Sequence, residues 1–115
     1  AYPFSIDEDG TIRLRALLGA IAGDVQAGRP TGQIAAAFHV TVARMVARAA
    51  ERVRVHTGLG TAALSGGVFQ NRLMLRLARE ALRDAGFEVL THRQVPANDG
   101  GLSLGQAVIG LHSLL

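Results

Sequence analysis

The sequence contains no cysteine, no lysine and no tryptophan. Without cysteine, the chain cannot form a disulfide, a thiolate metal site or a cysteine nucleophile, although this absence says nothing about the compartment. The sequence also has no apolar run of about 18 residues, the length that suggests a membrane-spanning helix, and its first residues lack the basic-then-apolar pattern of a secretory signal. These absences predict a soluble, cytoplasmic protein that does not enter a membrane.

Aromatic residues are scarce, since the 115 residues include one tyrosine and four phenylalanines. They cannot form a platform on which nucleic-acid bases stack. The net charge of +3 arises because 12 arginines outnumber 9 acidic residues. Four of the arginines recur at helical spacing with acidic residues between them, as on a solvated helix face: Arg72, Arg76, Arg79 and Arg83. We therefore expect no nucleic-acid partner.

Apolar character is what the sequence has in abundance. Apolar residues make up 49% of the chain and charged residues 18%, which is typical of a globular domain rather than a disordered segment. A chain of this length fits one domain with a core of its own. The first residue is alanine rather than methionine, which fits a processed, a trimmed or a partial chain.

Two helices are predicted in the first half of the chain. The first begins near Thr11 and stops at Gly28 and Pro30, both of which end helices. Thr31 can cap the second, the longest predicted element, which ends at residues 57–60. Each helix has an apolar stripe at spacings of three and four: Leu14, Leu17, Leu18, Ile21 and Val25 in the first, and Ile34, Phe38, Val42, Met45, Ala49 and Val53 in the second.

The second half alternates strands and helices. Residues 61–64 are a short apolar run typical of a buried strand, and residues 87–92 form a second strand. Between them a helix runs from about Asn71 to Ala85. This order favours a parallel pair and an α/β fold, a short sheet with packed helices. Two strands are marginal alone, so either further strands lie within residues 1–12 or a partner segment completes the sheet.

A last helix follows the loop at residues 95–101. Its apolar side chains fall on one face: Leu104, Ala107, Val108, Leu111 and Leu115.

The turn at residues 65–68, Ser-Gly-Gly-Val, is the first candidate site. A strand that runs into two glycines and then a helix leaves bare backbone N–H groups at a helix N-terminus, where a phosphate or ribose can approach closely. Ser65 and Asn71 add side-chain donors on either flank. The turn has neither the spacing of a dinucleotide fingerprint nor the ending of a Walker loop. The alternative is a tight turn whose glycines only satisfy backbone geometry.

The loop Asn98-Asp99-Gly100-Gly101 is the second candidate. Because both loops follow strands, they should share the carboxyl edge of the sheet, where ligands of open α/β sheets bind. There Asp99 could ligate a hard cation or bind substrate, although one carboxylate does not make a metal site. The alternative is ordinary turn chemistry with an aspartate cap.

The four histidines give no metal-binding pair, because no two of them are spaced three or four residues apart. His39 lies on the long helix and is expected to be packed or partly exposed rather than catalytic. His92 follows the second strand and is the one histidine expected near the sheet edge. Ser65 is not predicted to be a nucleophile, since Gly-x-Ser-x-Gly is missing and no acid–base partner can be named.

Two motifs carry a resemblance to a known family. LSGGVFQNRL at residues 64–73 and VPANDGGLSLGQA at residues 95–107 resemble the C-terminal end of the hydrogenase-maturation carbamoyltransferase family, HypF. Residues 2–4 and 34–39 also look like that family, so the resemblance covers essentially the whole chain. It implies one lobe of an actin/hexokinase-like (ribonuclease H-like) fold. Residues 1–115 would then be the second lobe of the final carbamoyltransferase domain, a fragment of a longer chain.

The resemblance implies that the parent enzyme uses ATP and carbamoyl phosphate to form carbamoyl-adenylate. The carbamoyl group would then pass to the C-terminal cysteine of a partner, HypE, on the route to the cyanide ligands of nickel–iron hydrogenase. Asp99 would complete a divalent-metal site whose other ligands lie upstream, and a cation there would stabilise the negatively charged nucleotide intermediate. The implied nucleotide-binding residues are Ser65, Gly66, Gly67, Val68, Asn71 and Gly100.

Other parts of that family are missing from these residues: the acylphosphatase-like domain, the cysteine zinc fingers, the adenylate-forming domain and the upstream histidine ligands. We therefore expect the isolated lobe to be inactive and to bind nucleotide weakly, because half of an interdomain cleft cannot enclose a ligand. Its expected partners are the rest of its own chain and a HypE-like acceptor. The alternatives are a non-catalytic module that dimerises through its exposed cleft face, and another O-carbamoyltransferase or nucleotide-binding lobe.

Overall fold

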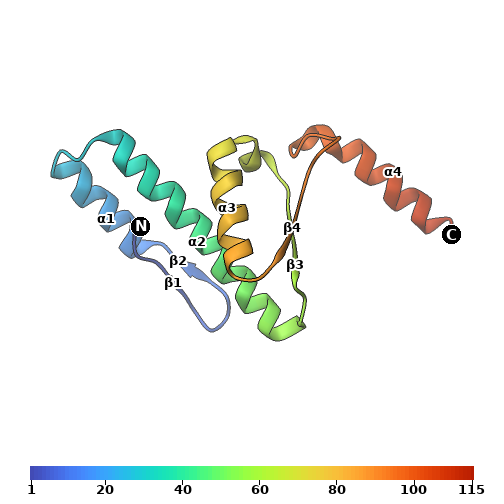
Figure 1. Cartoon of the computed structure of the whole chain (residues 1–115), viewed down its shortest axis with the longest axis horizontal. Helices are drawn as coiled ribbons and strands as arrows, with labels where there is room; N and C mark the ends of the chain where they lie inside the picture. The colour runs from blue at the N-terminus through green and yellow to red at the C-terminus, as the bar shows by residue number, and fades with distance from the viewer.

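The computed structural model describes all 115 residues and has four α-helices and two small sheets. In Figure 1 the long helix α2 runs diagonally through the molecule, with α1 and the N-terminal strands towards the left and α3 and the second sheet towards the right. The elements are, in chain order, β1 (Ser5–Ile6), β2 (Ile12–Arg13), α1 (Arg15–Gln26), α2 (Thr31–Thr57), β3 (Thr61–Leu64), α3 (Arg72–Asp84), β4 (Glu88–Thr91) and α4 (Leu102–Ser113). Short 3-10 helices at Gly67–Gln70 and Asp99–Gly101 precede α3 and α4.

The second half of the chain folds as the sequence predicts. β3 and β4 pair in parallel, from Thr61 opposite Glu88 to Leu64 opposite Thr91. α3 forms the crossover between the two strands and packs against α2. The parallel pair and the helices around it confirm an α/β fold with a short sheet and packed helices.

The N-terminal segment contradicts the prediction of a helix beginning near Thr11. β2 instead pairs antiparallel with β1, and α1 begins only at Arg15. The turn at residues 7–10 closes this hairpin, and the N–H of Gly10 donates to the Asp7 carbonyl at 3.0 Å. That turn gives β2 a strand partner, so its residues pair across the hairpin and do not extend α1 towards Thr11. The hairpin is a separate sheet, so it does not widen the β3–β4 pair.

α2 is buried on two sides rather than along the single apolar stripe predicted. One core cluster joins it to α3 and the second sheet: Ala43, Ala47, Leu64, Met74, Ala78, Leu82 and Phe87. The other joins it to the N-terminus and α1: Tyr2, Leu17 and Met45. By contrast, Phe38 and Val53 of the predicted stripe are 41% and 53% exposed. The prediction that Thr31 caps α2 is also wrong, because Pro30 holds the cap position and Thr31 is already helical.

A chain of hydrogen bonds fastens the N-terminus to α1 and α2. The Tyr2 N–H donates to Oγ1 of the fully buried Thr41 at 2.7 Å, and that hydroxyl donates to the Ala37 carbonyl at 2.7 Å. The Tyr2 hydroxyl and the Arg29 guanidinium both donate to Asp24 Oδ2 at 2.6 Å. These two donors, Tyr2 first, hold the pKa of Asp24 below its ordinary value. The same bond to Asp24 raises the pKa of the Tyr2 hydroxyl.

α4 leaves the rest of the molecule. Figure 1 shows it projecting at the C-terminal end, and none of its 12 residues is buried. The apolar side chains that the sequence places on one face of this helix therefore stay exposed within this chain. The large apolar residues of the helix are all exposed: Leu102, Leu104, Val108, Ile109 and Leu111. No helix of the chain is long and apolar enough to cross a membrane.

The whole molecule is open for its size. Its accessible surface is 8020 Å², whereas a compact monomer of the same mass would expose about 6000 Å². Its radius of gyration is 17.0 Å, against about 13 Å for a compact domain of the same length. The excess surface, roughly 2000 Å², exceeds the share of about 800 Å² that one partner gives to a standard protein–protein interface.

Candidate functional site

The two candidate loops meet where β3 and β4 end. Because the strands pair in parallel at a constant offset, the residues just beyond them, Ser65 and His92, also lie side by side. Their side chains are hydrogen-bonded, with His92 Nε2 2.8 Å from Ser65 Oγ. One residue further, the Gly66 N–H donates to the Ala97 carbonyl at 2.7 Å. These two bonds tie the loop after β3 to the loop after β4.

A cavity of about 320 Å³ lies at this junction. Both loops and the first turns of α4 line it: Ser65, Gly66, His92, Pro96, Ala97, Asn98, Asp99, Gly101, Leu102, Gly105, Gln106 and Ile109. The structure therefore brings Ser65, Gly66 and Asp99 to one place. The other predicted nucleotide-binding residues do not line the cavity: Gly67, Val68, Asn71 and Gly100. Its volume is at the low end of the roughly 300–1000 Å³ range of small-molecule sites, so it suits one part of a nucleotide.

The two glycines of the first loop differ in whether the local backbone geometry requires a glycine. Gly66 has φ of 106°, a backbone angle that strongly favours glycine. Gly67 has no such angle, and a Cβ there would meet nothing within 4 Å. Purely local geometry thus explains the first glycine and not the second.

The expectation of bare N–H groups on these glycines, at the start of a helix, needs correction. The N–H of Gly66 is already bonded to Ala97, because the loop after β4 crosses in front of it. The 3-10 helix then separates the turn from α3, which begins only at Arg72. Gly67 and Val68 begin that 3-10 helix. Their N–H groups therefore have no acceptor carbonyl within the helix.

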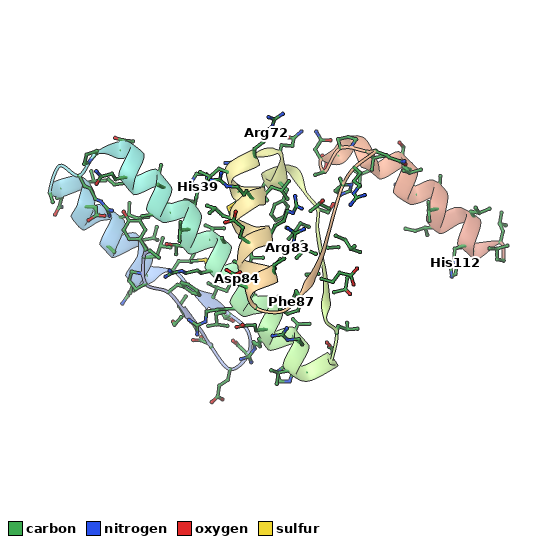
Figure 2. The ribbon with its side chains drawn as sticks, in the orientation of Figure 1. His39, Arg72, Arg83, Asp84, Phe87 and His112 are labelled. Atoms are coloured by element: carbon green, nitrogen blue, oxygen red, sulfur yellow. The ribbon has the colours of Figure 1, made fainter.

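The side chain of Asn71 makes two hydrogen bonds within the chain. Its Oδ1 accepts from the Met74 N–H at 3.1 Å, so it caps α3 where the sequence predicts the helix to start. Its Nδ2 lies 2.9 Å from His39 Nε2, and His39 Nδ1 lies 2.8 Å from the Ala35 carbonyl. Because a carbonyl can only accept, a neutral His39 donates through Nδ1 and accepts from Asn71 through Nε2. Figure 2 shows His39 on α2, near the end of α3 that carries Arg72. His39 therefore holds the start of α3, and it is partly exposed as expected.

Asp99 opens the 3-10 helix ahead of α4. The cap is its neighbour Asn98, whose Oδ1 accepts from the Gly100 N–H at 2.9 Å, so Asp99 does not serve as the cap. A Cβ at Gly100 would lie 3.0 Å from Asn98 Oδ1 and from Pro96 Cγ, and this crowding accounts for the glycine. The exposed Asp99 carboxylate takes part in none of the three ion pairs of the chain.

The sequence predicted that His92 lies near the sheet edge, but it did not predict the hydrogen bond to Ser65. It lies at the sheet edge as expected, and it is the partner that could not be named for Ser65. The pairing was missed because 27 residues separate the two side chains. The available signal was the pairing of two strands of equal length, which predicts that the residues after them are neighbours.

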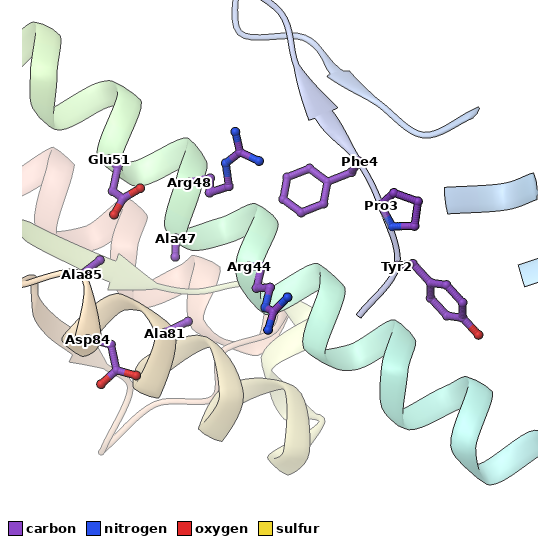
Figure 3. Close-up of a pocket in the computed structure, with 10 residues that line it drawn as sticks. All are labelled: Tyr2, Pro3, Phe4, Arg44, Ala47, Arg48, Glu51, Ala81, Asp84 and Ala85. Atoms are coloured by element: carbon purple, nitrogen blue, oxygen red, sulfur yellow. The ribbon is translucent and has the colours of Figure 1, made fainter. Parts of the chain in front are cut away.

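A larger cavity of about 650 Å³ lies between the N-terminal segment, α2 and the end of α3. Figure 3 shows Phe4 and three alanines among its lining, together with four charged side chains: Arg44, Arg48, Glu51 and Asp84. The Arg48 guanidinium lies 5.2 Å from the centroid of the Phe4 ring and so packs over its face. None of the predicted site residues lines this cavity.

Known proteins match this chain in both sequence and structure. Residues 1–106 match the family described as carbamoyltransferase, Kae1-like domain, second subdomain. Carbamoyltransferase HypF2 of Cupriavidus necator is 40% identical over 107 residues, which are 92% of this chain and 13% of that protein.

Two solved structures share the fold. A crystal structure of full-length HypF in its phosphate- and nucleotide-bound form superposes with a TM-score of 0.88 at 40% identity, over 99% of this chain and 15% of that one. HypF of T. kodakarensis superposes with a TM-score of 0.80 at 31% identity, over 96% of this chain and 14% of that one. The chain thus spans a small part, 13–15%, of the length of these relatives.

Proposed function

Because the chain belongs to the HypF carbamoyltransferase family, we propose that it forms the second lobe of that enzyme's carbamoyltransferase domain. In this proposal residues 1–115 are one lobe of an actin/hexokinase-like fold, and the cavity at the strand ends is one wall of an interdomain cleft. The complete protein binds ATP and carbamoyl phosphate and forms carbamoyl-adenylate. It then passes the carbamoyl group to the C-terminal cysteine of a HypE-like acceptor during hydrogenase maturation.

The transfer step defines what this lobe has to do. The acceptor sulfur attacks the carbamoyl carbon, a carbon–sulfur bond forms, and the bond from that carbon to the phosphate oxygen breaks. AMP leaves with the electron pair of that bond, and the thiol proton passes to solvent. The lobe must therefore hold the phosphate and stabilise the charge that grows on it, which fixed hydrogen-bond donors do well.

The observation that carries the proposal is the meeting of the two loops at the strand ends, where Ser65, Gly66 and Asp99 line one cavity. Gly66 is required by its φ angle and Gly100 by crowding, whereas nothing in this chain requires Gly67. A ligand that approaches the backbone closely accounts for a glycine there. The N–H groups of Gly67 and Val68 can donate to a phosphate or ribose oxygen. The Ser65 hydroxyl lies on the adjoining cavity wall.

Asp99 is the residue that would hold the divalent cation. Its carboxylate is exposed at the cavity and free of ion pairs, as a ligand for a hard cation should be. No group of three histidine, cysteine or acidic side chains in the chain could hold a metal. The remaining ligands must therefore come from another segment. When bound, the cation would offset negative charge on the nucleotide phosphates.

The rest of its own chain is the partner that the open surface favours. The chain exposes about 2000 Å² more surface than a compact monomer. The exposed apolar residues of α4 contribute to this surface, which favours a partner that covers them. Full-length HypF, in which the rest of the enzyme is present, superposes on 99% of this chain. We propose that those further segments cover α4 in the intact enzyme.

A second copy of the chain is the other candidate cover, and it corresponds to a non-catalytic dimerisation module. The same exposed leucines and valines favour it, because they would be buried in a symmetric pair. Light scattering on this chain separates the two. A monomer across a wide concentration range would exclude the dimer and leave the rest of the enzyme as the partner.

The function is tested in the intact enzyme that carries this lobe, with carbamoylation of the acceptor protein as the measurement. Asp99→Ala should abolish transfer while thermal unfolding stays unchanged, and Glu80→Ala on the exposed face of α3 is the matched control. Gly67→Val should weaken ATP binding by placing a side chain where the ligand lies, since within this chain it meets nothing. Full carbamoyl transfer by the Asp99→Ala enzyme would refute the metal assignment, and unimpaired ATP binding by Gly67→Val would refute the nucleotide contact.

A further inference from the structure

The hydrogen bond between Ser65 and His92 has no part in the function proposed so far. Strand register creates it, because β3 and β4 pair residue by residue up to Leu64 opposite Thr91 and these two side chains come next. The 2.8 Å bond lies on the wall of the cavity that Asp99 also lines. An imidazole thus holds a hydroxyl at the point where a ligand would enter.

The direction of this bond decides what Ser65 can offer to a ligand. With His92 Nε2 unprotonated, Ser65 donates its proton to the imidazole and presents only lone pairs to the cavity. With a proton on Nε2, His92 donates to Ser65 Oγ, and the serine proton is left to donate into the cavity. A phosphate oxygen only accepts hydrogen bonds, so it is bound by the second arrangement.

We propose that His92 is a positioning residue that sets the Ser65 hydroxyl as a hydrogen-bond donor to a phosphate oxygen of the bound nucleotide. The proposal rests on the function proposed above. The Gly66–Ala97 bond, 2.7 Å long, supports it by tying together the loops that carry the two side chains. His92 therefore acts through Ser65 and does not need to touch the ligand itself.

A purely structural role for the pair makes a different prediction. Both side chains are exposed, and water can replace a hydrogen bond at an exposed position, so the bond adds little to the stability of the fold. If the pair only tied the loops together, its loss would leave nucleotide binding as it was or change binding and unfolding together. If the pair orients a donor, its loss lowers the affinity for the nucleotide and leaves the stability of the fold unchanged.

The experiment uses the intact enzyme with ATP and Mg²⁺ as the probe. His92→Phe keeps the ring but removes both nitrogens, and we expect ATP affinity to fall about tenfold, with KM for ATP rising more than kcat falls. His92→Gln places an amide N–H near the position of Nε2, and we expect it to restore affinity to within about threefold of the wild type. His56→Phe is the matched control, because it makes the same change at the far end of α2, ahead of β3.

A double-mutant cycle tests whether His92 acts through Ser65. Ser65→Ala should weaken ATP binding about as much as His92→Phe, and the double variant should be no weaker than either single one. Wild-type ATP affinity in His92→Phe would overturn the proposal, as would a His92→Phe loss that persists in full in the Ser65→Ala background. A His92→Gln enzyme no better than His92→Phe would also count against it.

The Asp99→Ala enzyme separates failure of this inference from failure of the proposed function. If Asp99→Ala abolishes carbamoyl transfer while His92→Phe binds ATP like the wild type, the positioning role alone is wrong. If Asp99→Ala retains full transfer and Gly67→Val retains ATP binding, the proposed function is wrong and the inference falls with it.

Discussion

Residues 1–91 and the helix α4 are both rich in apolar side chains, but only the first region uses them within the chain. Leu82 on α3 is 0% exposed, whereas Leu111 on α4 is 63% exposed. Both are leucines on amphipathic or apolar helices of similar length, Arg72–Asp84 and Leu102–Ser113. The difference is that α3 packs between α2 and the sheet, while α4 only borders the cavity at the strand ends and buries none of its own residues.

This contrast shows what apolar composition does and does not determine. A helix that is rich in apolar side chains favours a surface that covers it. Composition does not say which surface covers it. In α3 the strand–helix–strand order supplies the cover from the same chain, whereas for α4 we propose that the rest of the enzyme supplies it.

The largest expected effect comes from a deletion in the core of the first region. Leu82→Ala should lower the free energy of unfolding by about 2–5 kcal/mol, because it removes buried methyl groups and leaves a cavity between α2 and α3. Leu82→Met, which conserves volume, should cost less than about 1.5 kcal/mol. Urea denaturation of the three proteins measures both. A loss below about 1 kcal/mol for Leu82→Ala would show that this cluster does not hold the region together.

A smaller effect is expected at the polar contact between the N-terminus and α2. Thr41→Val keeps the shape of the side chain but leaves the Tyr2 N–H without its acceptor, which should cost about 1–3 kcal/mol. Thr57→Val is the matched control, because the Thr57 hydroxyl makes an exposed bond to the Val53 carbonyl and its loss should stay within about 0.5 kcal/mol. Equal losses at the two positions would contradict the buried role of Thr41.

Acid should weaken the first region through Asp24. Its pKa is lowered in the folded chain by Tyr2 and Arg29, so the unfolded chain binds a proton first as the pH falls. The stabilisation is present above the ordinary carboxyl range, near pH 4, and is lost as the pH falls from there through the lowered pKa. We expect the urea concentration at the midpoint of unfolding to fall as the pH is lowered from about 6 to about 2. The fall should be less steep in Asp24→Asn than in the wild type. α4 has no carboxylate and takes no part in this effect. Parallel pH profiles for the two proteins would refute the role of Asp24.

The smallest effect on this chain is expected in α4. Leu111→Ala should change its free energy of unfolding by less than about 0.5 kcal/mol, because the side chain already faces water. In the intact enzyme the same substitution should cost more, since we propose that the other segments cover this helix. Denaturation in the two contexts gives the comparison directly. A negligible change in both would mean that nothing covers this face of α4.

Short-range signals predicted the second half of the chain well. Strand β3, the start of α3 near Asn71, the end of that helix near Gly86 and strand β4 all follow from neighbouring residues. The first half was harder, because β2 directly precedes a helical stripe and forms a strand only when the turn at residues 7–10 brings β1 beside it. α2 could not be predicted in full either, since its two buried sides depend on which distant segments pack there.

At the candidate site, the sequence by itself determined which residues stand in the two loops and that both loops follow strands, and its motifs indicated the family. Only the tertiary structure decided which of those residues meet. It brought the Gly66 N–H to the Ala97 carbonyl and His92 to Ser65. The physical reason is range: a helix or turn is set by neighbours a few residues apart. A hydrogen bond at 2.8 Å between side chains 27 residues apart depends on the register of two paired strands.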